Sequence, residues 1–415
     1  MYKGALLSQI FLMLFGFMVT AEAAMKEHQH HNADISNTVC DKQGVMPSLS
    51  CANAPSAVFD NNGRLWLAWV FGEHVYVNYS DDKGKTYSPP VAVNTVAENI
   101  YAMGENRPKI VVTNKGHIYI SWTQKLSKRF SGHIRFSRSI DGGKHFSEPI
   151  TVNDHLVVTS HRFDAMAVND RGDIYLAWLD KRDLLAAKKA GQPYNGAAVY
   201  YAVSTDGGIT FNTNEKIIDN SCQCCRVVMA IDNDQLPVVL WRHIFGDNIR
   251  DHALVKFDSQ LKSGKVVRVS HDQWQVEACP HHGPDISIAD NGSYHLVWFN
   301  NAPERHGLFY ANTSDQGKNI STAINFGNYN KQAAHPQVLS QGKAVFIAWK
   351  EFDGKQATLL TMKSPDSGKT WSEPRVLEKT TGNSDHPLLI NDGKKVYAVW
   401  HRRGQDYQLF PLNND

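Results

Sequence analysis

Short apolar runs that end in tryptophan recur seven times along the chain. The seven tryptophans stand 51 to 63 residues apart, and a period of this length predicts one supersecondary unit repeated seven times. The runs occupy residues 65–69, 118–122, 174–178, 237–241, 294–298, 345–349 and 396–400.

The first unit shows how each repeat is built. Apolar runs at 55–59, 65–69, 75–79 and 91–94 are separated by Asn, Asp and Gly, which is typical of antiparallel hairpins. Four such strands make a sheet that is too small to bury its faces alone. Radial repetition lets every sheet pack on two neighbours and leaves only short edges. We therefore predict an all-β fold, a β-propeller of seven four-stranded blades, with six blades as the alternative.

A second repeat, Ser-x-Asp-x-Gly-x-x-aromatic, lies between the third and fourth predicted strands. Its four full copies begin at Ser80, Ser139, Ser204 and Ser364. This pattern resembles the Asp-box, or BNR repeat, of sialidase-like propellers, and the resemblance covers nearly the whole chain as architecture. The Ser and Asp side chains can close the turn on backbone N–H groups, and the Gly permits a positive φ. In the family these turns lie on the outer rim, so they imply a fold rather than an activity.

The later repeats are less regular. The fifth unit keeps Thr313, Asp315 and Gly317 but has Ile320 where the aromatic residue is expected, and the last unit ends one strand short. We expect a segment between residues 35 and 49 to supply that strand and close the ring. The predicted segments are a signal peptide at 1–23, a histidine-containing segment at 24–50 and a single propeller at 51–415.

The first residues have the form of a secretory leader. Lys3 precedes an apolar stretch at 5–19, and Ala21-Glu22-Ala23 has the small-x-small form of a cleavage site. The apolar stretch is about 15 residues long, which is short for a bilayer span, so we favour cleavage over retention as a membrane anchor. No later run predicts a span. We expect a periplasmic or secreted protein, and a monomer.

The charge of the chain is nearly balanced. It has 43 basic and 41 acidic side chains, a net charge of +2, and neither sign forms a long run. Nucleic-acid-binding proteins normally have a basic patch on a recognisable module. We therefore expect no nucleic-acid partner.

Export into an oxidising compartment changes how the six cysteines are interpreted. Cys40 and Cys51 lie close together in the sequence and predict a disulfide. Cys222, Cys224 and Cys225 form a Cys-x-Cys-Cys motif at the start of the fourth unit. Adjacent cysteines seldom pair with each other, so Cys224 and Cys225 need different partners.

A Cys-Pro-His-His motif begins the fifth unit at Cys279. The starts of innermost strands line one mouth of a propeller channel, so this motif and the three earlier cysteines should be neighbours. Thiolates and imidazoles together suit copper, or zinc as second choice. The predicted ligands are Cys222, Cys224, Cys225, Cys279, His281 and His282, with His335 and His386 across the channel. The alternative is a pair of disulfides that join adjacent blades.

Arginine and histidine occur at equivalent strand starts in units two to seven. These positions are Arg107-Pro108, His161-Arg162, Arg226, His282 to Pro284, His335-Pro336 and His386-Pro387. Such a mouth predicts a site for a small anionic ligand, a glycan or a metal ion. The alternative is strand-start chemistry, in which proline ends the edge and the preceding residue is incidental. The N-terminal tract with His28, His30 and His31 can likewise bind metal or be a simple tail.

Enzymes of the sialidase family hold the substrate carboxylate with three arginines and use a tyrosine nucleophile, a glutamate base and an aspartate acid/base. The resemblance implies that Arg107, Arg162 and Arg226 are candidates for the three arginines. It implies Tyr101 as the nucleophile, Glu105 as the base and Asp164 as the acid/base. Arg107 matches the family's Arg-Ile-Pro signature only in part. Sialidases also have six units and do not need the two cysteine motifs, which argues against hydrolysis.

Three hypotheses about function follow from the sequence. The first is an exported sialidase-like propeller whose mouth binds a transition metal, with copper favoured, or an anionic ligand. The second is an exo-glycosidase that acts on acidic sugars. The third is a non-catalytic interaction platform in which the cysteines are structural staples. Fold-level resemblance alone does not choose among them.

Overall fold

The computed structural model describes residue 40 and residues 44–412, which belong to one compact unit, Asn37–Asp415. A second unit, Met1–Ser36, lies wholly outside the described residues. The predicted signal peptide and the N-terminal histidine tract therefore remain predictions. Within the described residues no helix is both long enough and apolar enough to cross a membrane.

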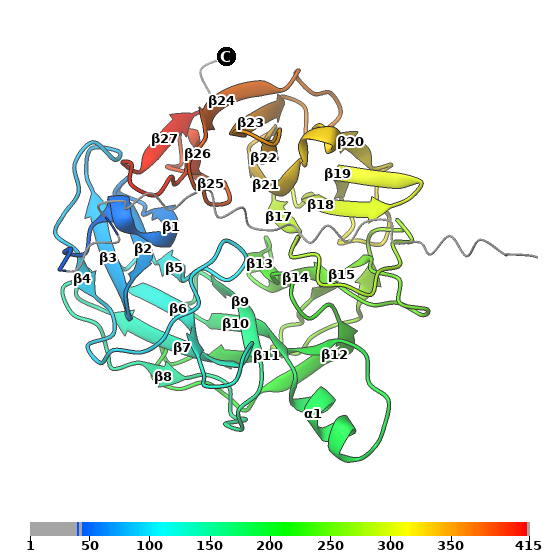
Figure 1. Ribbon diagram of the computed structural model, residues 1–415, viewed down its shortest axis with the longest axis horizontal. Helices are drawn as coiled ribbons and strands as arrows, with labels where there is room; N and C mark the ends of the chain where they lie inside the picture. The colour runs from blue at the N-terminus through cyan, green and yellow to red at the C-terminus, as the bar shows by residue number, and fades with distance from the viewer. Residues whose placement is uncertain (1–39, 41–43, 413–415) are drawn as a thin grey trace, which may run out of the picture. The chain divides into compact units, whose positions relative to one another are not determined.

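Seven antiparallel sheets follow one another around a ring in chain order (Figure 1). The first sheet contains β1 (Asn53–Phe59), β2 (Leu65–Phe71), β3 (His74–Ser80) and β4 (Val91–Ala92). The second contains β5 (Lys109–Val112), β6 (Ile118–Lys125), β7 (Gly132–Ser139) and β8 (Ile150–Thr151). The third contains β9 (His161–Val168), β10 (Ile174–Asp180), β11 (Ala197–Ser204) and β12 (Glu215–Ser221). The next two contain β13 (Val228–Ile231), β14 (Pro237–Arg242), β15 (His252–Lys256) and β16 (Val267–Arg268); β17 (Asp285–Ile288), β18 (Tyr294–Ala302), β19 (Arg305–Thr313) and β20 (Ile324–Phe326). The last two contain β21 (Ala334–Gln341), β22 (Ala344–Phe352), β23 (Ala357–Ser364) and β24 (Arg375–Thr380); β25 (Leu388–Asn391), β26 (Val396–Trp400) and β27 (Gln408–Pro411). The fold is therefore a seven-bladed β-propeller, as predicted, and the six-bladed alternative is wrong.

The second strand of each sheet carries the core. In β2, six of the seven residues are buried, because the strand lies between two neighbouring sheets and both of its faces are covered. The tryptophan that marks each repeat is at most 2% exposed in all seven sheets. The apolar runs in the sequence are thus the strands that pack sheet against sheet.

The ring closes where the first and last sheets meet, with β1 in contact with β25. The last sheet has three strands among the described residues, as the shortened last repeat predicts. The described part of the segment expected to complete it, residues 40 and 44–49, contributes no strand. The rest of that segment lies outside the described residues, so the closing strand remains a prediction. The predicted Cys40–Cys51 disulfide is confirmed, and it ties this segment to the short 3-10 helix η2 (Leu49–Cys51) that precedes β1.

The Ser-x-Asp-x-Gly turns connect the third and fourth strands of four sheets. In each turn the Ser hydroxyl donates to the Asp carboxylate at 2.8 Å and accepts the Gly N–H at 2.7–2.9 Å. These local hydrogen bonds stabilise the sharp turn between the two strands.

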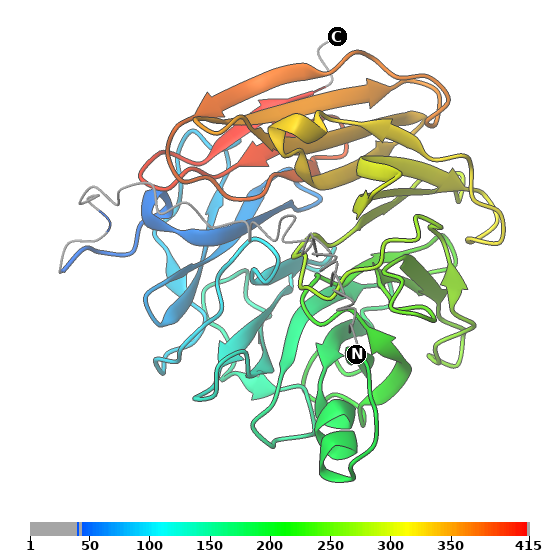
Figure 2. The ribbon, with the colours of Figure 1, turned by 45° about the vertical axis from the view of Figure 1, so that its right-hand side comes forward.

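One helix interrupts the regular pattern. The helix α1 (Arg182–Lys189) lies in the connection between β10 and β11 and projects outward from the third sheet (Figures 1 and 2). A second short 3-10 helix, η3 (Tyr329–Lys331), precedes β21. Neither helix was predicted from the repeat pattern.

Candidate metal centre and channel mouth

The first strands of all seven sheets enclose a small cavity. Its volume is about 240 Å³, and its lining includes residues of β1, β5, β9, β13, β17, β21 and β25. Gly104, Glu105, Arg107, Arg226 and His386 also line it. A larger hollow, of about 630 Å³, is lined by residues of β15 and β16 and by the turn after β19, and it contains none of the predicted site residues.

Glu105, in the loop between β4 and β5, reaches segments that lead into four other sheets. Its Oε1 accepts hydrogen bonds from the Arg226 guanidinium at 2.7 Å and from His335 Nδ1 at 3.2 Å, and it lies 3.5 Å from His386 Nδ1. Its Oε2 accepts the backbone N–H groups of Arg226 at 3.2 Å and Gly283 at 2.9 Å. A carboxylate offers about four acceptor sites. The carboxylate is therefore saturated by the protein itself, and its side chain is 1% exposed.

Two glycines permit this close approach. A Cβ on Gly104 would lie 2.3 Å from Nδ1 of His386. A Cβ on Gly283 would lie 2.2 Å from Cγ of Arg226 and 2.8 Å from Oε2 of Glu105. Neither position can accept a larger residue unless the ring centre moves.

Three imidazoles form a stack beside this carboxylate. The rings of His335 and His386 are 3.3 Å apart at their centroids and 15° from parallel. His282 extends the stack at 4.7 Å from His335 and lies 4.1 Å from the ring of Phe299. Because both Nδ1 atoms face the Glu105 carboxylate, they act as donors and leave Nε2 as the acceptor atom. Ligand atoms of Glu105, His335 and His386 lie within 4.8 Å of one another, but parallel rings direct their in-plane lone pairs side by side rather than toward one ion.

Burial and charge set the protonation of this group. Burial alone would raise the pKa of Glu105, but the charge of Arg226 and the hydrogen bonds from His335 and His386 hold that pKa well below its usual range. Burial lowers the pKa of His386 to about 3, although Glu105 opposes the shift. Burial and the neighbouring His386 also hold the pKa of His335 well below its ordinary value. The centre is thus an ionised carboxylate with neutral imidazoles.

Two of the three predicted carboxylate-binding arginines bind the protein itself. Arg107 donates to the carbonyl of Pro55 at 2.7 Å and to the carboxylate of Asp385 at 3.2 Å. Arg226 donates to Glu105 and, at 3.1 Å, to the carbonyl of Pro336. Both guanidinium groups tie one sheet to another around the channel.

The other predicted catalytic residues lie in a separate arrangement. The guanidinium of Arg162 lies 4.1 Å from the ring centroid of Tyr101. Asp164 is fully buried, accepts the Ser121 hydroxyl at 2.6 Å and lies 3.9 Å from Nζ of Lys109. Among the described residues no hydrogen bond joins Tyr101 to a carboxylate. The geometry thus pairs Glu105 with Arg226, and Arg162 with Tyr101, but it does not assemble the six as one site.

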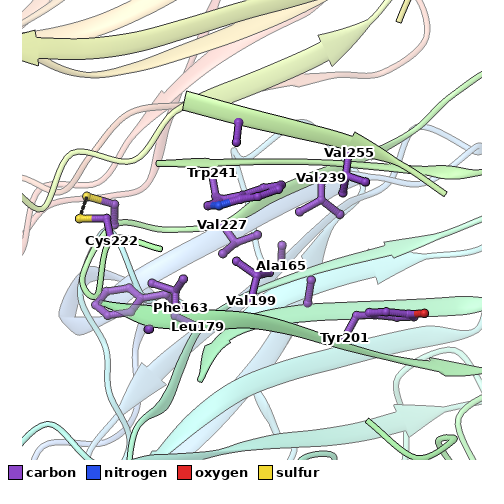
Figure 3. Packing of buried hydrophobic residues seen from close by; sticks show 14 of the residues in the cluster. Phe163, Ala165, Leu179, Val199, Tyr201, Cys222, Val227, Val239, Trp241 and Val255 are labelled. Atoms are coloured by element: carbon purple, nitrogen blue, oxygen red, sulfur yellow. Dashed lines mark hydrogen bonds between the residues drawn. The ribbon is translucent and has the colours of Figure 1, made fainter. Parts of the chain in front are cut away.

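Three of the predicted metal ligands meet in a buried cluster, which we call the thiol cluster: Cys222, Cys224 and Cys225. Sγ of Cys222 lies 4.0 Å from Sγ of Cys224 and 3.6 Å from that of Cys225. None of the three is in a disulfide, and they are 0%, 5% and 2% exposed. Figure 3 shows Cys222 at one end of the apolar interface between the third and fourth sheets, beside Phe163.

Two buried arginines face the thiol cluster. Nη1 of Arg250 donates to Sγ of Cys222 at 3.4 Å, and Arg242 acts on the same thiol through its charge. Neither arginine forms an ion pair with a carboxylate in the described part of the chain. Hydrogen bonds from Cys224 and Cys225, together with these two charges, hold the pKa of Cys222 well below its usual range although burial opposes this. Cys222 therefore has a thiolate environment.

The Cys-Pro-His-His motif lies next to the cluster, but its residues separate. Cys279 is exposed, and its interaction with the thiol of Cys224 lowers the pKa of Cys279 to about 7. His281 is exposed, and its φ of 53° is in the left-handed region. His282 turns inward to the imidazole stack instead. The predicted ligands thus divide into a sulfur group and an imidazole group. The two groups are adjacent because Cys225 belongs to the thiol cluster and the next residue, Arg226, binds Glu105 beside the imidazoles.

Neither arginine beside the cluster was among the site residues predicted from the sequence. Arg242 directly follows the tryptophan of the fourth repeat, and Arg250 lies in the loop before β15. A cation placed at the end of an otherwise apolar strand, in the repeat that begins with three cysteines, was the available signal.

Comparisons with known proteins support the fold. The sequence matches no model of a protein family and no curated protein. Among solved structures, the chain is similar to the Hadza microbial sialidase Hz136, with 13% identity, a TM-score of 0.50 and coverage of 84% of this chain and 76% of that one. It is also similar to a PL25 ulvan lyase (11% identity, TM-score 0.53, coverage 87% and 93%) and to the polysaccharide lyase Uly1 (11%, 0.54, 88% and 90%). At these identities the likeness shows the fold alone: this chain is a sialidase-like seven-bladed β-propeller.

Proposed function

We propose that the protein is an exported metal-binding propeller that holds one copper(I) ion in the thiol cluster, with zinc as second choice. The observation that carries this proposal is the convergence of three buried cysteines that form no disulfide. Soft thiolate ligands select copper(I), zinc or iron–sulfur clusters.

The sulfur spacing fits a metal ion of this class. With metal–sulfur bonds of about 2.3 Å, neighbouring sulfurs are about 3.8 Å apart in a tetrahedral site and about 4.0 Å apart in a trigonal one. The observed separations from Cys222 are 4.0 and 3.6 Å. A disulfide would instead need about 2.0 Å.

Charge favours copper(I) over zinc. Three thiolates around a monovalent ion have a net charge of −2, and around a divalent ion −1. The positive charges of Arg242 and Arg250 act on Cys222, and those of Arg162 and Lys181 act on Cys224. Buried charges are normally paired, so the cationic surroundings match the more negative complex.

The imidazole group is a less suitable site. The carboxylate of Glu105 has no acceptor position left for a metal, and the stacked rings of His335 and His386 do not converge. The central cavity, at about 240 Å³, is also smaller than the roughly 300 Å³ at which ligand pockets begin. The geometry therefore gives less support to a glycan or anion site at the channel mouth.

Metal binding is tested on the mature chain, reduced without oxygen and titrated with copper(I)–bicinchoninate. We expect about one copper per chain by elemental analysis, and loss of binding in the Cys222→Ser/Cys225→Ser variant while the far-ultraviolet spectrum is unchanged. A matched control, Cys40→Ser/Cys51→Ser, removes two sulfurs elsewhere and should still bind. Uptake of zinc but not copper would select the second metal, and uptake of neither would refute the proposal.

A thiol count on the unreduced protein separates metal binding from structural staples. The protein is denatured in a chelator without reductant, and its free thiols are counted. If it binds metal as proposed, four thiols should react, because only Cys40 and Cys51 are paired. A count of zero would establish two staples instead. Release of sugar from a fluorogenic sialoside would support the exo-glycosidase hypothesis.

A further inference from the structure

The four free cysteines are arranged from the surface inward. Cys279 is exposed, Cys224 beneath it is 5% exposed, and Cys225 and Cys222 are 2% and 0% exposed. The segment after Cys279 packs on the residue after Cys225, since the carbonyl of Pro284 accepts a hydrogen bond from Nε of Arg226 at 3.1 Å, and the thiols of Cys279 and Cys224 interact electrostatically. Cys222, the deepest, is the sulfur that contacts Arg250. A path of neighbouring sulfurs therefore runs from solvent to the charged end of the cluster.

We infer that Cys279 is a transfer ligand, which takes copper(I) from an incoming complex and passes it to Cys224, and thence to the buried thiol cluster. This inference rests on the proposed function. The site that the metal finally occupies contains three sulfurs, Cys222, Cys224 and Cys225, and excludes Cys279.

Ligand exchange provides the chemistry. The thiolate of Cys279 forms a bond to copper as one ligand of the donor complex leaves. The thiolate of Cys224 then bonds to the ion while the bond to Cys279 breaks, and Cys225 and Cys222 complete the set as the last donor ligand departs. Each arriving thiol releases its proton to solvent. Copper remains in the +1 state throughout, so no oxidant or reductant takes part.

Packing argues that Cys279 is not a permanent fourth ligand. The three buried cysteines pack in the apolar interface of two sheets, whereas Cys279 is exposed in the loop before β17. The sulfur atoms of Cys222, Cys224 and Cys225 lie within 4.8 Å of one another, and Cys279 does not belong to that group. Cys279 is thus suited to a transient bond.

The test is the rate of copper uptake from copper(I)–bicinchoninate, followed by stopped-flow absorbance. In Cys279→Ser we expect uptake about ten-fold slower or more, because the ion must then wait for a local opening that exposes Cys224. The final occupancy should remain one copper per chain, and affinity in competition with the same chelator should change less than about three-fold, well under the ten-fold that 1.4 kcal/mol represents. His271→Ala, an exposed change in the same loop between β16 and β17, is the matched control and should load at the wild-type rate.

Each outcome is decisive. Unchanged uptake by Cys279→Ser would overturn the transfer role. A loss of occupancy or a large loss of affinity would also overturn it, because Cys279 would then be a permanent ligand. If the wild-type protein itself takes up no copper, the proposed function fails and the transfer role fails with it. Thermal unfolding of the metal-free variant confirms that any change is local.

Discussion

Replacement of Glu105 by glutamine tests whether this carboxylate holds the ring centre together. The amide keeps the size of the side chain but removes the charge that faces Arg226, and its NH₂ group would have to face donors at one of the two oxygen positions. Removing one partner of a buried ion pair leaves the other without compensation, at a loss of about 3–5 kcal/mol. We expect a loss of this size in the free energy of unfolding.

The expected change in melting temperature follows from the size of the propeller. An unfolding entropy of about 2.1 cal/mol/K per residue, over roughly 360 residues between β1 and β27, amounts to about 0.75 kcal/mol per degree. Glu105→Gln should therefore lower Tm by about 4–7 °C in differential scanning calorimetry at pH 7.5. Asp81→Asn, which breaks the exposed pair with Arg64, is the matched control and should lower the stability by at most about 1 kcal/mol.

Acid should reduce the difference between wild type and variant. The folded pKa of Glu105 is depressed, so its contribution is present above the unfolded value of about 4.3 and is lost as the pH falls through the folded pKa. The two proteins should therefore converge in stability below about pH 4. A Tm shift no larger than that of Asp81→Asn, or a difference that grows in acid, would refute this role for Glu105.

Three further changes test other parts of the structure. Burial lowers the folded pKa of His386 to about 3, so the stability that its neutral form contributes is present above about pH 6.5 and is lost as the pH falls. Between pH 7 and 5, the free energy of unfolding measured in urea should fall by about 2 kcal/mol less in His386→Gln than in wild type. Equal losses would contradict this. Arg250→Met should weaken copper(I) binding by about 10- to 100-fold in chelator competition, because a charge-assisted hydrogen bond to Cys222 is lost, and unchanged affinity would argue against a thiolate there. Cys40→Ser/Cys51→Ser should lose about 2–3 kcal/mol, since the disulfide closes a loop with a sequence separation of 11, and an unchanged Tm would show that this loop adds nothing to stability.

The fold could be predicted from the sequence because every repeat uses the same local chemistry. An apolar strand that ends in tryptophan must be covered on both faces, and only neighbouring copies of the same unit can cover it. The disulfide between Cys40 and Cys51 was similarly local. The helix α1 was not predicted, because it lies in a connection that the repeat does not constrain.

The role of Glu105 could not be predicted, because its partners are far away in the chain. Its hydrogen-bond partners Arg226, Gly283 and His335 are 121, 178 and 230 residues away. The family resemblance suggested Glu105 only as a catalytic base, and only the register of five blades shows that all its acceptor positions are occupied. The same holds for Arg107, whose partners Pro55 and Asp385 belong to the first and last blades.

The two arginines beside the thiol cluster also bear on whether its cysteines form disulfides. A disulfide is neutral, so pairing Cys222 with either neighbour would leave the guanidinium of Arg250 buried beside sulfur without a counter-charge. Leaving a buried charge unpaired costs about 3–5 kcal/mol, which matches or exceeds the roughly 2–4 kcal/mol that a disulfide contributes. Metal-bound thiolates keep their negative charge beside Arg250 and within the electrostatic influence of Arg242. The charges of Arg242 and Arg250 therefore oppose a disulfide in the cluster and favour a metal ion. Removal of these arginines should make the cluster easier to oxidise.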